Sequence, residues 1–538
     1  MSPAFLNVVE RPLHARSVRA AMAGMLLVGA LVAGTPGPAT AVSEACWDDV
    51  PTDVDGGGPD AVLGLPSYDL PGKPDAGAIV VFSNVAAAGE ADPSPPAART
   101  LLTADDFPGL STQTGARFGS SVVVWGDSRS DDVDDCADLL VGAPGQTVDG
   151  KVGAGRVFLL TGTVDGLSGV RLVLDESTLA GTGGPQAGAG FGASIAAASQ
   201  TTIAVGAPGR DVGGAVDAGR VVRLDYRGSS EPEVVVVEQG GSNAGRPESY
   251  DRFGEVLELM HSIEGSILVV GIPREDVGNR TDAGAVGMMP PNRPLSLVTQ
   301  DSPGAGGAAE AGDLYGAAID SYVTVTTHTI GVIVVGVPGE DVKGKADAGM
   351  VSFASFDMTF DPEFTVSPIA GWSRTLTQDS PGVRGVTETG DQYGSAVLAG
   401  EFGQERLSLV VTSPLEDLGD TVNAGLVAMT LIQPEDGSPT PGAQPGAWTQ
   451  DSAGVAGRAE RGDRFGTASS SVLLTSIEDD FDVVWRVAMT TVPREDVGGV
   501  ADAGMAYLGV APGARSIALV PPVRQAGAGL GMVPMQIG

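Results

Sequence analysis

The chain has 538 residues, of which 42% are hydrophobic, so it can bury a large core but is longer than one ordinary domain of about 100–200 residues. Glycine (79) and proline (37) are abundant without a collagen period, which favours many short strands joined by turns. The formal charge of −36, with no basic cluster downstream of the N-terminus, argues against nucleic-acid binding, because a phosphate-binding surface needs clustered Lys and Arg.

The N-terminal segment has the pattern of a secretory signal peptide. Arg11, Arg16 and Arg19 precede an apolar run over residues 20–34, and Ala39-Thr40-Ala41 supplies small residues for cleavage after Ala41. The alternative, a membrane anchor, needs about 20 apolar residues, and this run is shorter. We therefore expect residues 1–41 to be removed, and residues 42–538 to form a secreted, extracellular protein without membrane insertion.

Only two cysteines, Cys46 and Cys136, are present. An oxidising compartment would allow them to form a single disulfide. The sequence does not show whether they meet in space.

Seven copies of one pattern organise the rest of the chain. An Ala-Gly pair follows each copy's proline, and its glycine lies 11 residues after the proline in every copy. This fixed spacing predicts one rigid loop made seven times. The seven prolines, each closing an apolar run, are Pro66, Pro144, Pro208, Pro273, Pro338, Pro414 and Pro493.

Two acidic positions recur inside this post-proline loop. The third residue after the proline is Asp in six copies, and an Asp or Asn stands six residues later; the second copy has Thr147 and Gly153 instead. These carboxylates either form a ring for a ligand or hold turns by accepting backbone N–H bonds. We favour the turns, because residues repeated around a ring mostly maintain the ring. A binding site is more expected where copies differ, as in the second copy, which carries Lys151.

An aromatic-Gly pair precedes the proline run in six copies, and the first copy lacks it. The seventh position is filled near the other end of the chain by Leu530-Gly531, within a stretch that matches residues 186–199. The chain therefore starts halfway through a repeat and later supplies the other half, which suits a closed ring rather than a linear solenoid. We predict an all-β, seven-bladed β-propeller with four strands per blade, closed by pairing of C-terminal and N-terminal strands. The six pairs are Phe118-Gly119, Phe191-Gly192, Phe253-Gly254, Tyr315-Gly316, Tyr393-Gly394 and Phe465-Gly466.

The pairing of Phe-Gly with Gly-Ala-Pro, intact at Phe118 with Pro144 and at Phe191 with Pro208, resembles the FG-GAP repeat. That repeat builds the seven-bladed propeller of integrin α subunits and of many secreted bacterial proteins, and the usage here looks like the actinobacterial branch. The resemblance covers residues 42–538. It implies that the post-proline loops and the connectors between blades share one face, used by integrins for ligands, and that calcium loops lie on the opposite face.

The family's calcium loop, D-x-[DN]-x-D-G-x-x-D, implies calcium as a cofactor. The second copy reads "GDSRSDDVDDCADLLVGAP", in which Asp135 replaces the glycine of the turn. The first copy reads "DVDGGGPDAVLGLP", with a spacing one residue shorter. A solvated acidic hairpin is the alternative at both places. The candidate ligands are Ser130, Asp132, Asp134 and Asp138 with Asp127 nearby in the second copy, and Asp53, Asp55 and Asp60 in the first.

No catalytic or cofactor-binding residue is assigned, because His261 and His328 lie away from the repeated motifs and no Gly-x-Ser-x-Gly elbow occurs. We expect a binding, adhesion or scaffold module that presents loops to an extracellular protein or glycan. The alternative is a polysaccharide-active enzyme, which needs two carboxylates converging at about 5–10 Å.

The tripeptide Arg461-Gly462-Asp463 has the composition of a known integrin ligand. It stands where two other copies read "EAGDLYG" and "ETGDQYG". Its aspartate is therefore predicted to be the turn residue of the repeat, and only Arg461 is peculiar to this copy.

Overall fold

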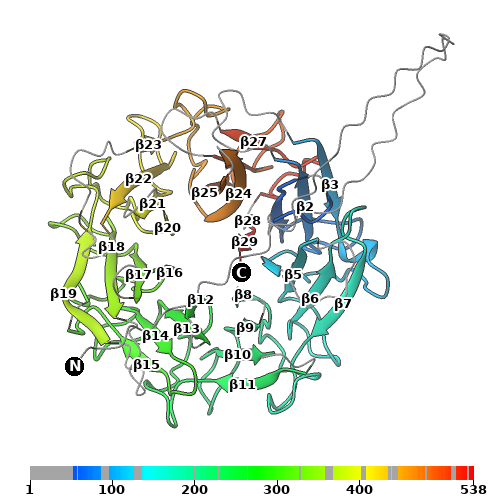
Figure 1. Ribbon diagram of the computed structural model, residues 1–538, viewed down its shortest axis with the longest axis horizontal. Helices are drawn as coiled ribbons and strands as arrows, with labels where there is room; N and C mark the ends of the chain where they lie inside the picture. Colours follow the sequence, from blue (N-terminus) through cyan, green and yellow to red (C-terminus); the bar gives the residue numbers. More distant parts are fainter. Residues whose placement is uncertain are drawn as a thin grey trace, which may run out of the picture. The chain divides into compact units, whose positions relative to one another are not determined.

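The computed structural model shows a ring of seven β-sheets built from the repeats (Figure 1). It describes residues 52–56, 58–85, 96–125, 136–198, 201–226, 231–262, 265–303, 305–325, 329–357, 367–401, 407–433, 438, 446–478, 481–509, 516–529 and 532–537. The predicted signal peptide lies outside these residues. Within them, no helix has the length and apolarity needed to cross a membrane.

Each blade has four antiparallel strands that lie side by side from the centre of the ring to its rim, and the sheet of blade 2 has a short fifth strand at its inner edge. The prediction of a seven-bladed, all-β propeller is confirmed, and within the described ranges the one helical element is the short 3-10 turn η1 (Ala104–Asp106). The innermost strands of blades 1 to 7 are β28 (Val533–Pro534), β4 (Ser121–Trp125), β8 (Ser194–Ala198), β12 (Val256–Ser262), β16 (Ala318–Val325), β20 (Val397–Glu401) and β24 (Ser469–Glu478). The second strands are β1 (Ala61–Leu65), β5 (Asp138–Ala143), β9 (Thr202–Ala207), β13 (Gly265–Ile272), β17 (Thr329–Val337), β21 (Leu407–Ser413) and β25 (Phe481–Val492). The third strands are β2 (Ala78–Ser83), β6 (Arg156–Thr161), β10 (Arg220–Asp225), β14 (Ala285–Met289), β18 (Met350–Asp357), β22 (Leu426–Ile432) and β26 (Met505–Leu508). The outermost strands are β3 (Ala98–Leu102), β7 (Gly169–Leu174), β11 (Glu233–Val237), β15 (Ser296–Val298), β19 (Ser367–Leu376), β23 (Gly446–Trp448) and β27 (Ile517–Leu519).

The ring closes as predicted, by pairing strands from the two ends of the described chain. Strand β28 pairs antiparallel with β1, with Leu63 opposite Pro534 and Gly64 opposite Val533. A further strand, β29 (Gln536–Ile537), pairs parallel with β4 of blade 2, opposite Val123 and Val124. This second attachment was not predicted, because a strand of two residues leaves no sequence pattern. It ties blade 1 to blade 2 as well as completing blade 1.

The core lies between adjacent blades. Residues of the second strands are buried on both sides, as in β9, whose six residues are all buried. Between blades 3 and 4, for example, Ala204 of β9 belongs to the same apolar cluster as Leu268 and Val270 of β13. Because both faces are covered, these strands show no alternation of polar and apolar residues in the sequence.

The repeated glycines allow neighbouring blades to approach each other closely. A Cβ built on Gly142 of the Gly-Ala-Pro run would lie 2.1 Å from the carbonyl oxygen of Gly192 in the next blade. The aromatic members of the six aromatic-Gly pairs are all buried in the interfaces between blades. Leu530, the seventh, lies outside the described residues.

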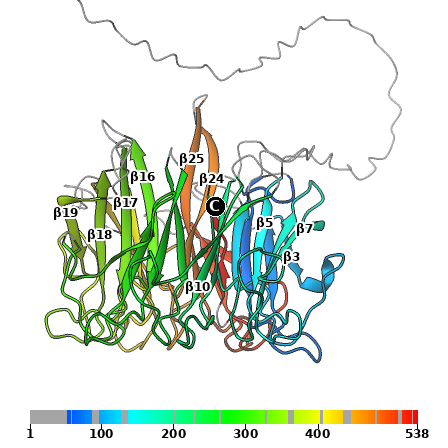
Figure 2. The same cartoon turned by 90° about the horizontal axis from the view of Figure 1, so that it is seen from below.

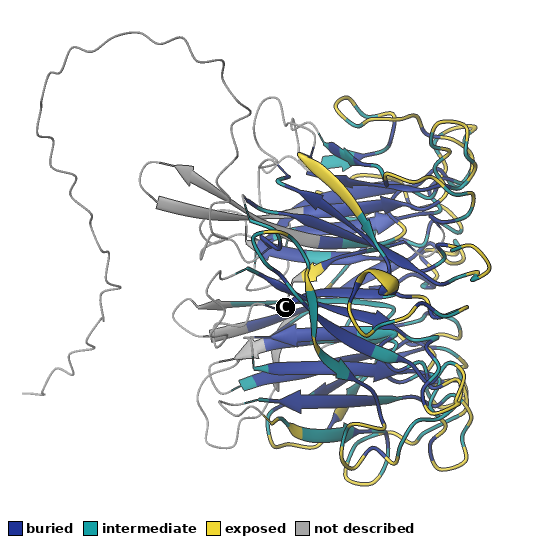
Figure 3. Ribbon diagram, turned by 90° about the vertical axis from the view of Figure 1, so that its right-hand side faces the viewer, coloured by how far each residue is buried: buried dark blue, intermediate teal, exposed yellow. Residues whose placement is uncertain are grey.

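Two kinds of segment share one face of the ring, as the resemblance implied. These are the post-proline loops and the connectors that lead from each outermost strand to the next blade; we call this side the loop face, and the opposite side the hairpin face (Figure 2). In the contact between blades 2 and 3, Phe191 N donates to Ala154 O (2.9 Å) and Gly188 N donates to Val152 O (2.9 Å). Figure 3 shows many exposed residues along the loops of this face.

The paired acidic positions of the post-proline loops hold turns, which confirms the prediction. In six copies the first Asp accepts the backbone N–H of the second position, as in Asp69 Oδ1 with Asp75 N at 2.7 Å. The second position has a positive φ in those six copies, for example +49° at Asp75. The second copy places Gly153 there, at φ +68°, and needs no carboxylate to favour that conformation.

The tripeptide Arg461-Gly462-Asp463 lies in the connector into blade 7. Asp463 is buried, and its Oδ2 accepts the backbone N–H of Glu460 at 2.5 Å. A buried turn carboxylate is not displayed to a receptor, so the interpretation of this aspartate as the repeat's own residue is confirmed.

Candidate metal centre

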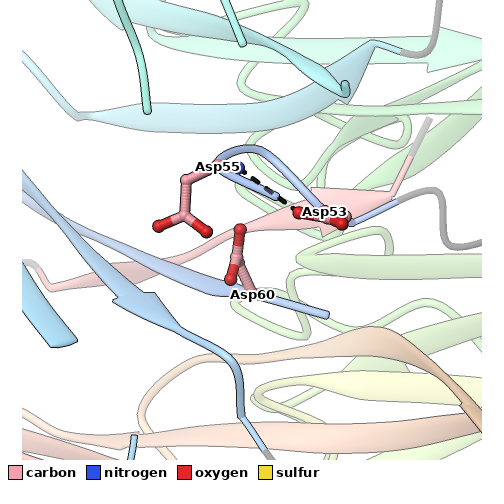
Figure 4. A group of neighbouring side chains, drawn as sticks. All are labelled: Asp53, Asp55 and Asp60. Carbon is pink, nitrogen blue, oxygen red and sulfur yellow. Dashed lines mark hydrogen bonds between the residues drawn. The ribbon is translucent and has the colours of Figure 1, made fainter. Parts of the chain in front are cut away.

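Three carboxylates converge on the hairpin face of blade 1, in the loop that leads into β1. Asp53, Asp55 and Asp60 each offer an oxygen, and these oxygens all lie within 4.8 Å of one another (Figure 4). The structure thus brings together the three candidates of the first copy. This face is the one on which the family resemblance places calcium loops.

The backbone of the loop is shaped around two of these carboxylates. Asp53 Oδ1 accepts the N–H of Gly56 (2.7 Å), and its Oδ2 accepts that of Gly58 (3.3 Å). Gly56 and Gly58 have φ values of +77° and +142°, which a residue with a side chain rarely adopts. Asp60 accepts the N–H of Val54 at 2.8 Å. The glycines of this segment therefore let the chain curl around its own acidic groups.

Two of the three acidic groups are buried, and Asp55 is partly buried. Asp53 is 1% exposed and Asp60 is fully buried. Burial, followed by the negative charge of Asp55, raises the pKa of Asp60 to about 8. Among the described residues, no Lys or Arg forms an ion pair with Asp55 or Asp60. Like charges at this separation need either a proton or a cation among them.

Two oxygens of the site are buried without a hydrogen-bond partner. They are Asp55 Oδ1 and Asn84 Oδ1. Asn84 follows β2, and its backbone N–H donates to Asp60 Oδ1 at 2.9 Å, which anchors it beside the triad. Ser83 Oγ, the neighbouring group, donates to Asp55 Oδ2. Ser83 and Asn84 were not predicted from the sequence, because they belong to no motif. The pairing of β1 with β2 brings them to Asp60.

The donor set fits a hard divalent cation. It consists of three carboxylates and an amide oxygen, with no nitrogen or sulfur ligand, and calcium favours such oxygen ligands on an irregular, tightly turned loop. The unpartnered oxygens of Asp55 and Asn84 are the groups that an ion would satisfy. Asp53, Asp55, Asp60 and Asn84 would hold the ion, which would neutralise the buried charge and cross-link the loop to the end of β2.

The candidates of the second copy are mostly outside the described residues, namely Asp127, Ser130, Asp132 and Asp134. Asp138 is described and buried, at the start of β5. Its Oδ1 accepts Gly162 N (3.0 Å), and its Oδ2 accepts Arg171 Nη1 (3.1 Å). A fixed positive charge therefore already accompanies this carboxylate.

The disulfide remains a prediction, because Cys46 lies outside the described residues. Next to Cys136, Ala137 N donates to Asp53 O at 2.8 Å. This bond brings Cys136 close to the segment that follows Cys46.

Compared with models of known protein families and with curated proteins, the chain matches none of them.

Proposed function

We propose that this chain is a secreted FG-GAP-type propeller that acts as an extracellular binding module, with its loop face as the contact surface and calcium as a structural ion. The contacts of the repeat motifs support the FG-GAP assignment. Gly119 N of the Phe-Gly pair donates to Gly142 O of the Gly-Ala-Pro run at 3.0 Å, and Gly192 N donates to Gly206 O at 2.9 Å. The two halves of the motif thus contact each other in blades 2 and 3.

One observation carries the binding function. Among the described residues, the large hydrophobic side chains that are exposed all lie on loops of the loop face. An exposed apolar side chain gains free energy only when a partner covers it. A rigid disc that gathers such side chains on one side is suited to holding a protein or glycan there. The five residues are Val152, Val216, Tyr250, Val386 and Val523, exposed by between 46% and 71%.

Calcium would serve this function from the opposite face. The triad fixes the entry into β1, and β1 pairs with β28 to close the ring. An ion there would stabilise the closed disc without touching the partner. The role supported is structural, since Asp53 and Asp60 are buried.

A binding array of extracellular proteins and glycans tests the proposal, using the chain from residue 42 onward. We expect saturable binding that is weakened at least 10-fold by changing loop-face residues together, as in Val152→Ser with Val216→Ser. Matched changes on the exposed part of β3, such as Arg99→Ser, should leave binding unchanged. Binding that is equally sensitive to both sets, or no binding at all, contradicts the proposal.

A further inference from the structure

One turn on the loop face occurs at seven equivalent places, and in one of them the residue that donates the turn's hydrogen bond differs from the other six. In each, the residue three positions before the aromatic-Gly position donates its N–H to the carbonyl eight residues after a repeat proline. The donor is glycine in six copies and Tyr250 in the connector into blade 4, which donates to Val216 O at 2.8 Å. The six glycines are Gly115, Gly188, Gly312, Gly390, Gly462 and Gly527.

The backbone at this position has a conformation that suits glycine. The six glycines have φ values between +69° and +90°, and Tyr250 has φ +76°. In this region a Cβ crowds the backbone, and a bulky residue is a clear outlier. Since six copies fold with glycine, the turn needs no side chain. A tyrosine retained against the backbone preference points to a role outside the fold.

The side chain of Tyr250 leaves the loop face for solvent. A Cβ built on the equivalent glycines Gly115, Gly188, Gly312, Gly390 or Gly462 meets nothing within 4 Å. Tyr250 is 59% exposed, and Val216, whose carbonyl accepts its N–H, is 46% exposed. The pair forms a small apolar patch. Tyrosine is among the residues that most often dominate binding interfaces.

The surroundings of this patch are acidic. Asp217 follows Val216, and Asp211 accepts its N–H. Negative charges of Glu248, Asp276 and Asp282 act on the neighbouring Asp251. Nearby cations are fewer: Arg252 and Arg274 both lie against Glu255, at 3.2 and 3.7 Å, and Arg246, four residues before Tyr250, is exposed. The excess charge is therefore negative, in keeping with the −36 of the whole chain.

We propose that Tyr250 is the anchor of the loop face for a protein partner that presents Lys or Arg. A cation over the phenol ring is attracted by the ring's negative face, and the carboxylates around it complete the charge complementarity. This inference rests on the proposed binding function and specifies the class of its partner. Val216 extends the contact with apolar surface.

The test uses the full secreted chain and a synthetic probe. The probe is a 12-residue Gly/Ser peptide with four arginines, compared with the same peptide carrying citrulline, which keeps the shape of arginine but not its charge. We expect the arginine peptide to bind more tightly at physiological salt, where diffuse attraction is screened. Tyr250→Gly should weaken it at least 10-fold, while Tyr250→Trp retains binding.

Two controls separate this role from a structural one. Tyr250→Gly introduces the residue of the six other copies, so its melting temperature should be equal to that of the parent or higher. Thr100→Ala changes an exposed side chain of β3, outside the loops of this face, and should leave peptide binding unchanged.

Unchanged affinity of Tyr250→Gly, equal binding of the citrulline peptide, or a lowered melting temperature of Tyr250→Gly overturns the inference. So does a glycan whose binding depends on Tyr250, because the partner would then be of another class. If any of these outcomes is found while the loop face still binds other partners, only the role of Tyr250 is contradicted. If the chain binds nothing on the array or among the peptides, the proposed function fails with it.

Discussion

Asp60 of blade 1 and Asp138 of blade 2 occupy equivalent places but have different partners. Asp60 directly precedes β1 and Asp138 is the first residue of β5. The Oδ1 of each accepts the N–H of the residue after the third strand, Asn84 or Gly162. Asp138 then pairs with Arg171, whereas Asp60 faces two further carboxylates. The fold needs this hydrogen bond in both blades. The charge of the carboxylate is neutralised by Arg171 in blade 2, and we propose that a bound cation neutralises it in blade 1.

The same contrast recurs on the loop face. In blade 3, Arg210, two residues after the proline, pairs with Glu176 at 3.0 Å. In blade 5 the equivalent positions hold Glu340 and Gln300, and Gln300 Nε2 donates to Glu340 at 2.7 Å. Burial raises the pKa of Glu340 to about 7. Gln300 neutralises no charge, so burial favours the protonated form of Glu340 below about pH 7.

Calcium should produce the largest difference between the two aspartates. At 100 times its Kd, calcium would stabilise the native chain by about 2.7 kcal/mol, so EGTA should lower the melting temperature. Asp55→Asn keeps the shape of the site and relieves repulsion, but it removes a charged ligand. We expect this variant to melt at the same temperature with calcium or EGTA in differential scanning fluorimetry.

A parent protein that melts identically with and without chelator would contradict the calcium proposal. Asp175→Asn provides a control at a buried carboxylate that is paired with Arg156. It should lower stability while leaving the response to calcium intact.

Removing the internal cation of blade 2 should be the next largest effect. Arg171→Met leaves Asp138 buried without this ion pair and should reduce the free energy of unfolding by about 2 kcal/mol, less than for a fully buried pair because water reaches Arg171. Urea unfolding would measure it. The double variant with Asp138→Asn should recover part of the lost stability. If Arg171→Met alone left the free energy of unfolding unchanged, Arg171 would not be the group that neutralises Asp138.

The pH dependence of calcium binding should also distinguish Asp60 of blade 1 from Asp138 of blade 2. Because the pKa of Asp60 is raised in the folded chain, its favourable contribution to the free energy of unfolding is present at low pH. This contribution is lost as the pH rises through about 8. Calcium competes with that proton, so calcium should bind more tightly as the pH rises towards 8. The Kd should fall about tenfold for each pH unit, a change of about 1.4 kcal/mol in binding free energy. Isothermal titration calorimetry at pH 6.5 and 7.5, in buffers of different ionisation heat, would check both the affinity and the proton count. A Kd independent of pH would contradict the assignment of Asp60 as a ligand.

The smallest effect concerns Glu340. Its pKa is raised in the folded chain, so stability should fall as the pH rises from about 4.5 to 7. Glu340→Gln removes this group and should make the decline in melting temperature between pH 5 and 8 slightly shallower. The difference corresponds to less than about 1 kcal/mol in the free energy of unfolding, because the group is partly solvated. The exposed Glu233→Gln serves as control and should leave the slope unchanged. A steeper decline in Glu340→Gln would reverse the expected sign.

The ring could be predicted from the sequence because the same pattern of spacing is repeated in seven copies. The 11-residue spacing and the displaced half-repeat at Leu530-Gly531 determine the number of blades and how they close, and no single residue has to be interpreted correctly. Strand β29 escaped prediction for the opposite reason. It is a two-residue pairing that depends on where the chain happens to run after β28.

The candidate site was only partly predictable. The spacing of Asp53, Asp55 and Asp60 is shorter than the family pattern, yet the loop brings their oxygens together, because two glycines with positive φ let it curl more tightly. Asn84 lies 24 residues from Asp60 and arrives through pairing of β1 with β2. Tyr250 could have been singled out by aligning the copies, but its meaning depends on the positive φ of that turn, which sequence alone does not give.

The attachment of residues 533–537 to β1 and β4 also imposes an order on synthesis. A ribosome delivers blades 2 to 7 one after another, while β1 waits with an unpaired inner edge until those residues emerge. During that interval the exposed edge is a template for pairing with other chains. The disc can therefore close only after synthesis has reached these residues, and a nascent protein cut short before residue 533 would remain open.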